Sequence, residues 1–114
     1  MIAVIFEVTL KENGKDRYLE IAGDLKVLLS EMDGFISIER FQSISNPSRY
    51  LSLSFWRDEN SVKLWRNQLA HREAQREGRN SLFEDYRLRV ANVLRDYGMD
   101  NREQSPVDIE QQYL

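Results

Sequence analysis

Hydrophobic and polar positions follow a strand-like pattern in four segments of the chain and a helical pattern in two others. The strand-like segments, most of them strictly alternating, are residues 2–10, 35–44, 49–56 and 86–97. Residues 15–32 and the stretch after Asp58 carry apolar residues three and four positions apart, which predicts amphipathic helices. The order is βαββαβ. It predicts an α+β, ferredoxin-like domain with a four-stranded antiparallel sheet and both helices on one face.

Turn residues and helix-end signals separate these segments. Residues 12–14 (Glu-Asn-Gly) and 46–48 (Asn-Pro-Ser) predict turns between elements. Asp33-Gly34 predicts the end of the first helix, with Gly34 in the left-handed conformation that favours glycine. Asp58 is expected to cap the second helix. A further helical segment is predicted from Leu69 to Arg79.

The length of 114 residues predicts one domain with one hydrophobic core. We assign residues 1–98 to this domain. Residues 99–114 have no clear period and lean acidic, which predicts either an extended arm or a disordered tail.

Both registers of the predicted strands carry large apolar side chains. On the third strand, Tyr50 and Trp56 belong to one face and Leu53 and Phe55 to the other. Two helices cover only one face of such a sheet, and an exposed apolar face of several hundred Å² is typical of an interface. We therefore expect a homodimer of closed symmetry that packs sheet to sheet, with the C-terminal tail as a candidate for crossing to the partner.

Composition narrows the classes of function. The net charge of −3 argues against broad binding of nucleic acid, which needs a basic face. The chain has no cysteine, so disulfides, thiol nucleophiles and cysteine metal sites are excluded. No apolar run approaches the roughly 20 residues that span a bilayer. The N-terminal segment is interpreted as a strand and not a signal peptide, so we expect no membrane partner and a cytoplasmic location.

Candidate chemistry is concentrated in the run from Leu51 to Arg79. The run contains both tryptophans, Trp56 and Trp65, and the only histidine, His71. An unperturbed imidazole titrates near neutral pH and can accept or donate a proton. Two large aromatic side chains and one imidazole in so short a span favour a pocket with a single proton-handling group.

Several features of the chain occur together in one known family. They are the order of elements, Phe55-Trp56, Trp65 within the next helix, and the segments HREAQ (71–75) and DYRLRVANVLRDYG (85–98). In these features the chain resembles the antibiotic biosynthesis monooxygenase family of the dimeric α/β-barrel superfamily. The resemblance covers roughly residues 1–98. It implies a ferredoxin-like protomer, a dimer built through the sheets, and a pocket between helices and sheet in each protomer.

The resemblance predicts a cofactor-independent monooxygenase that acts on a small aromatic or polyketide-like molecule. His71 would accept the substrate proton, and Trp65 would stand beside it as the second catalytic position. A hydroxyl such as that of Ser52 or Ser54 could hydrogen-bond a substrate carbonyl. We expect neither a metal nor a cofactor. The residues expected to bind the substrate are Phe6, Phe55, Trp56, Leu69 and Gln75.

Other interpretations remain open at this stage. A haem-degrading member would resemble the pattern of asparagine on the first strand, tryptophan on the helix after the third strand, and histidine about ten residues later. Here Phe6 and Gln75 occupy the first and last of these positions. A non-catalytic ligand-binding or sensor module would use the same scaffold. Trp65 could equally belong to the core, Trp56 to the dimer contact, and His71 to the surface.

Overall fold

The computed structural model describes residues 1–69 and 81–106, with the elements in the predicted βαββαβ order. The strands are β1 (Ile2–Leu10), β2 (Phe35–Gln42), β3 (Arg49–Trp56) and β4 (Phe83–Asn92). The helices are α1 (Lys15–Leu29) and α2 (Glu59–Leu69). The predicted α+β, ferredoxin-like class is confirmed. The predicted helical segment from Leu69 to Arg79 falls almost entirely outside the described residues.

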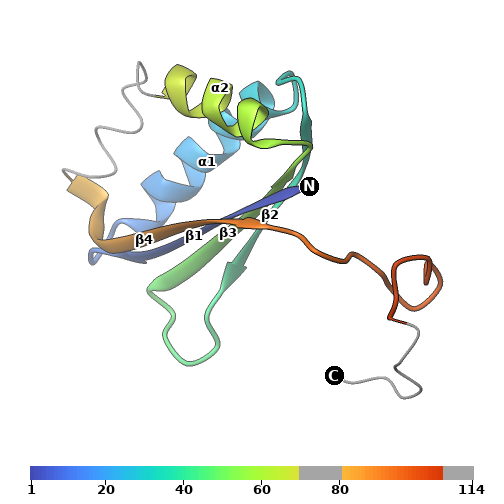
Figure 1. The fold of residues 1–114 in the computed structure, drawn as a ribbon. Coiled ribbons are helices and arrows are strands. Elements are labelled where there is room, and N and C mark those ends of the chain that lie inside the picture. The colour runs from blue at the N-terminus through green and yellow to red at the C-terminus, as the bar shows by residue number, and fades with distance from the viewer. Residues whose placement is uncertain (70–80, 107–114) are drawn as a thin grey trace.

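The four strands form one antiparallel sheet in the order β2-β3-β1-β4, and both helices lie on the same face of it (Figure 1). The registers align side chains in rows across the sheet. One row consists of Arg40, Ser52, Phe6 and Leu88, and the next of Ile38, Ser54, Val4 and Val90. Because neighbours in a row point to the same face, these rows form the surface on which the helices sit.

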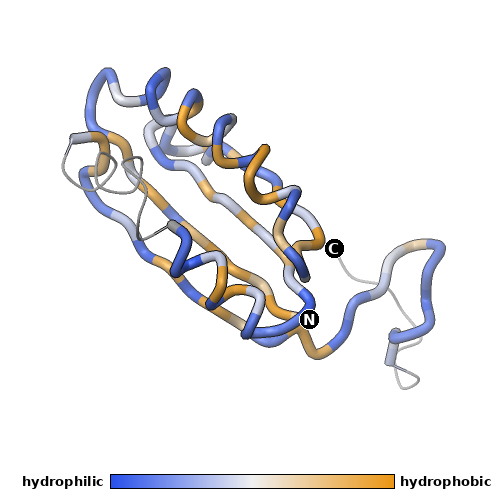
Figure 2. The backbone as a smooth tube through the Cα atoms, turned by 90° about the horizontal axis from the view of Figure 1, so that it is seen from above, coloured by the Kyte–Doolittle hydropathy of each residue, from blue (hydrophilic) through white to orange (hydrophobic). Residues whose placement is uncertain are grey.

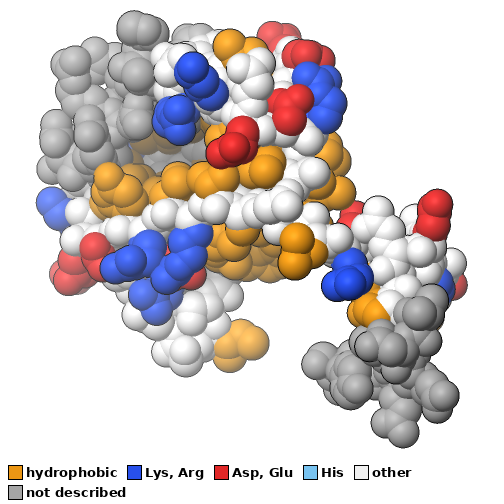
Figure 3. Space-filling model, viewed as in Figure 1, with side chains coloured by type: hydrophobic (Ala, Val, Ile, Leu, Met, Phe, Trp, Pro, Cys, Tyr) orange, Lys and Arg blue, Asp and Glu red, His pale blue; other side chains and the backbone are white. Residues whose placement is uncertain are grey.

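Two hydrophobic clusters hold the helices to the sheet. Both lie between helices and sheet, at opposite ends of the strands, and Figure 3 shows apolar side chains along this seam. The buried members of the first are Val8, Leu10, Tyr18 and Tyr50. The buried members of the second are Leu29, Trp56 and Val62. Seen from above, the helices are set apart, with strands visible between them (Figure 2).

The last strand differs from its predicted range of 86–97. It begins at Phe83, opposite Leu10, and ends at Asn92, opposite Ile2. Among the described strands, its neighbour in the sheet is β1 alone. The final ladder bond runs from the Val93 amide to the Met1 carbonyl, so the strand ends because its partner ends.

The first helix also ends earlier than the predicted Met32. Ser30 caps it, because its amide donates to the Lys26 and Leu28 carbonyls and its hydroxyl to the Val27 carbonyl. Gly34 does adopt the predicted positive φ, of 84°, but in the turn before β2 and not as the helix cap. The second strand stops at Gln42, where the Ser43 amide bonds to the Arg49 carbonyl and closes the hairpin.

A hydrogen-bonded junction joins the turn before β2 to the start of α2. We use this name for Asp33, Gly34, Arg57, Asp58 and Ser61. Asp58 is the predicted N-cap, and its Oδ1 accepts from the amide and the hydroxyl of Ser61, both at 2.8 Å. Arg57 donates through both terminal nitrogens to Asp33, at 3.0 and 3.2 Å, and through Nε to Asp58 at 3.1 Å.

The chain after β4 leaves the sheet as an arm that stands apart from the rest of the molecule (Figures 1 and 3). Its described part, residues 94–106, has local order of its own. The Asp96 amide donates to Gln104 Oε1 at 2.8 Å, and the Arg102 guanidinium lies 5.1 Å from the centre of the Tyr97 ring. Within the described ranges, no helix is long and apolar enough to cross a membrane.

Candidate functional site

A cavity between helices and sheet follows from the side chains of β3. Tyr50, Ser52, Ser54 and Trp56 alternate onto the helix-covered face, and all four are buried. The two large rings support the helix layer at either end. The two serines between them are too small to fill the space beneath the helices, and so they leave a hollow.

The cavity has a volume of about 440 Å³, within the usual range for small-molecule sites. Its floor is formed by the helix-facing rows of the sheet, and its cover by Tyr18, Ile21, Ala22, Leu25 and Leu29 of α1 and Val62, Trp65 and Arg66 of α2. Most of these side chains are apolar, so the cavity favours a ligand with a hydrophobic body.

Trp56 forms one end of the cavity and is 1% exposed. Its indole nitrogen donates to Ser54 Oγ at 2.9 Å. Its ring centre lies 5.4 Å from that of Phe35 and 6.4 Å from that of Trp65. Trp56 therefore belongs to the helix-covered face, and the alternative that placed it at the open, dimer-facing side of the sheet is wrong.

Trp65 belongs both to the hydrophobic core and to the lining of the cavity. It packs against the cluster of Leu29, Trp56 and Val62, and it also lines the cavity while remaining half-buried. The two interpretations that the sequence left open for this residue do not exclude each other, because the same side chain packs on the core and lines the cavity.

Phe6 lies in the middle of the cavity floor. It stands opposite Ser52 on one side and Leu88 on the other. Its ring centre is 5.7 Å from that of Phe83 and 5.8 Å from that of Tyr86, in tilted arrangements. Aromatic side chains therefore line the cavity floor from β1 to β4.

Phe55 does not line the cavity, and its assignment as a substrate-binding residue is not supported by its position. It is the neighbour of Trp56 on β3, and alternate residues of a strand point to opposite faces. Phe55 therefore lies on the open face with Leu53. The side chain of Leu69, and all of His71 and Gln75, lie outside the described residues.

Arg40 is a cavity residue that the sequence analysis missed. It lies on β2 beside Ser52, its Nε is shielded from solvent, and this Nε has no hydrogen-bond partner in the described part of the chain. The signal was present in the sequence, since Arg40 is two residues from Ile38 and shares its face. An arginine in the inward register of a strand is unusual and points to a special role.

Within residues 1–69 and 81–106, every charged side chain that lines the cavity is positive. Arg40 and Arg66 are its only charged residues in the described part of the chain, and no aspartate or glutamate lines it there. Burial raises the pKa of Tyr18, although the nearby Arg40 opposes this shift through its charge and a hydrogen bond. The Tyr18 phenol is therefore neutral at neutral pH and does not balance the charge of Arg40.

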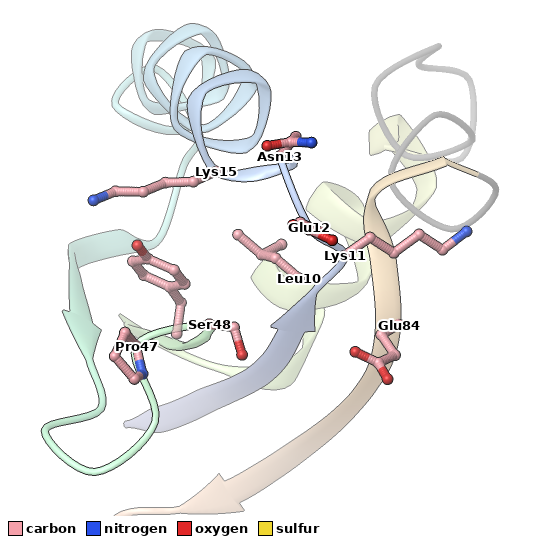
Figure 4. Close-up of a pocket in the computed structure, with 9 residues that line it drawn as sticks. Leu10, Lys11, Glu12, Asn13, Lys15, Pro47, Ser48 and Glu84 are labelled. Carbon is pink, nitrogen blue, oxygen red and sulfur yellow. The ribbon is translucent and has the colours of Figure 1, made fainter.

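A second hollow, of about 380 Å³, lies at the end of the sheet near the turn after β1 (Figure 4). It is lined mainly by polar and charged side chains, among them Lys11, Glu12, Lys15 and Glu84. These side chains carry both signs of charge, and Lys11, Glu12, Lys15 and Glu84 are themselves exposed. The cavity beneath the helices is therefore the better candidate site.

Across residues 1–69 and 81–106, no group of three or more histidine, cysteine or acidic side chains is arranged to hold a metal ion. The side chains that converge in the described cavity are thus aromatic and aliphatic groups, hydroxyls and two arginines.

Comparison with known proteins connects this architecture to a family. The family model described as antibiotic biosynthesis monooxygenase matches residues 1–77. A jasmonate monooxygenase from Pyricularia oryzae is 48% identical over 93 residues, which are 82% of this chain and 43% of that protein. The chain thus spans less than half the length of that relative. An uncharacterised Bacillus subtilis protein, YqjZ, is 31% identical over 91 residues, or 80% of this chain and 77% of its own.

The fold has close counterparts among solved structures. A proposed antibiotic biosynthesis monooxygenase from Nitrosomonas europaea superimposes with a TM-score of 0.70, covering 82% of this chain and 99% of that one. Its sequence identity is 14%, so this likeness concerns the fold alone. From the family match and its relatives, the chain belongs to the antibiotic biosynthesis monooxygenase family.

Proposed function

We propose that the protein is a monooxygenase whose substrate is a small, largely apolar organic molecule held between the helices and the sheet. The observation that carries this proposal is the cavity of about 440 Å³, which Phe6, Trp56 and Trp65 line. Family membership and the relative that acts on jasmonate support the reaction class. Jasmonate is therefore the first substrate to test.

The proposed reaction uses no bound cofactor. A substrate methylene next to a carbonyl or an electron-rich ring loses a proton to a base, and the resulting carbanion reduces O2 to form a hydroperoxide. Loss of water from the hydroperoxide leaves a carbonyl at that carbon. One oxygen atom enters the product and the other becomes water. The methylene supplies all the electrons, so no external reductant is consumed.

The residues have distinct proposed roles in this reaction. His71, which the sequence nominates as the proton acceptor, is the proposed base, with Gln75 and Leu69 nearby in the chain. Trp65 and Trp56 would hold the substrate between flat walls. Ser52, which is buried in the middle of the cavity floor, could donate its hydroxyl proton to the oxygen of the carbanion in its enolate form.

Oxygen uptake tests the reaction. Purified protein is supplied with jasmonate and with a panel of phenols, quinols and haem, and O2 consumption is followed with an electrode. We expect uptake with at least one apolar member of the panel and none with haem. Tight binding of one member without any uptake would contradict the monooxygenase proposal and support a ligand-binding module.

Two matched substitutions locate the site. Ser52→Leu places a large apolar side chain in the middle of the cavity, whereas Ser45→Leu makes the same change on the exposed hairpin between β2 and β3. We expect Ser52→Leu to abolish uptake and Ser45→Leu to preserve it. Equal activity in both variants would place the site elsewhere.

The role of His71 is tested separately. His71→Ala should abolish turnover, leave substrate binding within a few-fold of wild type, and preserve the thermal unfolding transition. Unchanged turnover in this variant would remove His71 from the mechanism.

We also propose a homodimer that packs open face to open face. The open face carries Ile5, Leu51, Leu53 and Phe55, which are half-buried within one chain. A patch of this kind is usually covered by a partner. The arm stands apart from the rest of the molecule (Figure 1), and its apolar side chains Leu94 and Met99 are exposed, which supports an arm that crosses to the partner.

Sedimentation at micromolar concentration tests the dimer. Leu53→Glu places a charge on the open face, and Ile44→Glu places one on a fully exposed hairpin position. We expect a wild-type dimer, a monomer for Leu53→Glu and an unchanged dimer for Ile44→Glu. A wild-type monomer would contradict the proposed assembly.

A further inference from the structure

Arg40 is the one polar group in the described cavity that the fold leaves with a buried, unsatisfied donor. Its Nε is the only shielded side-chain nitrogen or oxygen without a hydrogen-bond partner among the described residues. A buried donor of this kind destabilises the folded protein, and a charged one does so more strongly. A replacement by Met would fill the same space without this cost, so the stability of the fold does not explain the arginine.

Other arginines of the chain show what a structural role looks like. Arg57 contacts Asp33 and Asp58, and Arg89 contacts Glu7 at 3.0 Å. Arg40 has no carboxylate partner among the described residues, and its neighbour Tyr18 is a neutral phenol. Arg66 adds a second positive charge to the same cavity. The site is therefore complementary to an anion, although the whole protein carries a net charge of −3.

The guanidinium of Arg40 is suited to bind a carboxylate. It lines the cavity, and a carboxylate can accept two parallel hydrogen bonds from the nitrogens of one guanidinium. Ser52, next to Arg40 in the same row of the sheet, offers a hydroxyl beside this position. An anionic group bound here would balance the positive charge of Arg40, for which the described residues supply no carboxylate.

The rows of the sheet give the distance between the polar and apolar ends of the cavity. Ser52 and Trp56 lie four residues apart on β3, which corresponds to about 13 Å at the usual rise per strand residue. A ligand with its anionic head at Arg40 would thus extend its body past Ser54 toward the two tryptophans. This length suits a molecule of roughly ten to fifteen heavy atoms.

We propose that Arg40 anchors the carboxylate of the ligand, so that the cavity selects small amphipathic acids over neutral molecules of the same shape. This inference rests on the proposed function, because it takes the same cavity as the substrate-binding site. It assigns Arg40 a positioning role, since a fixed acid group determines which carbon of the substrate faces the base and O2.

The first test needs no variant. The two tryptophans both line the cavity, so intrinsic fluorescence reports occupancy. Jasmonate and its methyl ester have nearly the same shape and differ in the charge of one end. We expect the acid to bind about 10- to 100-fold more tightly than the ester, the range for one charge-assisted contact. Equal affinities would overturn the proposal.

The second test uses a probe pair unrelated to the proposed substrate. 1-Anilinonaphthalene-8-sulfonate and N-phenyl-1-naphthylamine share a ring system, and only the first is an anion. We expect Arg40→Met to weaken the sulfonate about 10- to 100-fold and to leave the neutral probe within about twofold. Arg40→Lys keeps the charge but cannot donate two parallel hydrogen bonds, so its affinity for the sulfonate should lie between those of wild type and Arg40→Met.

Arg66→Met is the matched control, because it removes the other positive charge that lines the cavity from an exposed position. A larger loss of sulfonate binding in Arg66→Met than in Arg40→Met would overturn the assignment of Arg40. The assignment would also be overturned if Arg40→Met lost affinity for the anionic and the neutral probe alike while its unfolding transition was preserved.

The two proposals can fail independently. Anion selectivity that depends on Arg40, without oxygen uptake from any acid, would refute the monooxygenase function and uphold the anchor. Oxygen uptake that treats acid and ester alike, with unchanged activity in Arg40→Met, would refute the anchor and uphold the function.

Discussion

The junction and the cavity use arginine in opposite ways. In the junction, Arg57 is more than half exposed, yet its guanidinium has three hydrogen bonds to Asp33 and Asp58. In the cavity, Arg40 is more deeply placed, yet its Nε has no partner. Water could have satisfied Arg57 without any help from the protein, whereas it cannot reach the Nε of Arg40.

This difference in hydrogen bonding distinguishes residues that stabilise the fold from residues that are suited to bind a ligand. The polar groups of the junction satisfy one another, and they fix the turn before β2 against the first turn of α2. The cavity keeps small hydroxyls, and an arginine with no carboxylate partner among the described residues, in a space that apolar side chains could have filled. Binding sites are commonly maintained at such a cost in stability.

The largest expected effect comes from Gly34→Ala in the junction. Gly34 has a φ of 84°, and a Cβ at this position would overlap the Ser61 hydroxyl, which is buried at the start of α2. Backbone strain and steric overlap together should lower the free energy of unfolding by about 2–5 kcal/mol. Urea denaturation measures this change.

Gly23→Ala is the control for this substitution. Gly23 lies within α1, and a Cβ there meets no atom within 4 Å. Alanine favours the helix over glycine by about 1 kcal/mol, so this variant should be more stable than wild type. A similar loss of stability in both variants would show that the junction has no special constraint.

The next effect concerns the stability of the cavity. Arg40→Met removes the unsatisfied donor and leaves an apolar side chain of similar length. We expect the free energy of unfolding to rise by about 1–2 kcal/mol. Arg57→Met should instead lower it, because Asp33 and Asp58 lose their partner. Destabilisation by Arg40→Met would mean that Arg40 holds the fold and would erase the contrast with Arg57.

The smallest expected effect is the pH dependence of the junction. Hydrogen bonds from the Ser61 amide and hydroxyl, and then from Arg57, lower the pKa of Asp58 to about 2. The hydrogen bond from Arg57 likewise lowers the pKa of Asp33. Because these pKa values are lower in the folded state, the stabilisation is complete above about pH 4 and is lost as the pH falls toward about 2.

Asp58→Asn isolates this contribution. Chemical denaturation of both proteins from pH 6 to pH 2 should show wild type as the more stable above pH 4, with the difference shrinking toward pH 2. A difference that stays constant over this range would show that the charge of Asp58 does not stabilise the junction.

Much of the fold was predictable because local rules decide it. Alternation assigned β1 and β3 their observed bounds, and Asp58 was identified as the cap that it is. The end of β4 was not predictable, since Asn92 is its last residue only because β1 begins opposite it. A strand ends where its partner ends, and the partner is distant in the sequence.

Some residues of the candidate site could likewise be predicted from the sequence, and others could not. Phe6, Trp56 and Trp65 were nominated from the sequence as aromatic residues, and the fold brings these three to one cavity. Phe55 was nominated with them, but the one-residue offset from Trp56 sends it to the other face. Arg40 was overlooked: its spacing from Ile38 places it on the inward face, but its position beside Ser52 depends on the register between β2 and β3.

By itself, the sequence determined the order of elements, the two apolar faces of the sheet and the supply of aromatic side chains, since each follows from periodicity and side-chain chemistry along a short stretch. Only the tertiary structure decided that two serines stand below the helices and leave a cavity, and that Arg40 lines it with no carboxylate partner in residues 1–69 and 81–106. The space and the charge balance of the cavity depend on residues from all six helices and strands, which no local sequence pattern brings together.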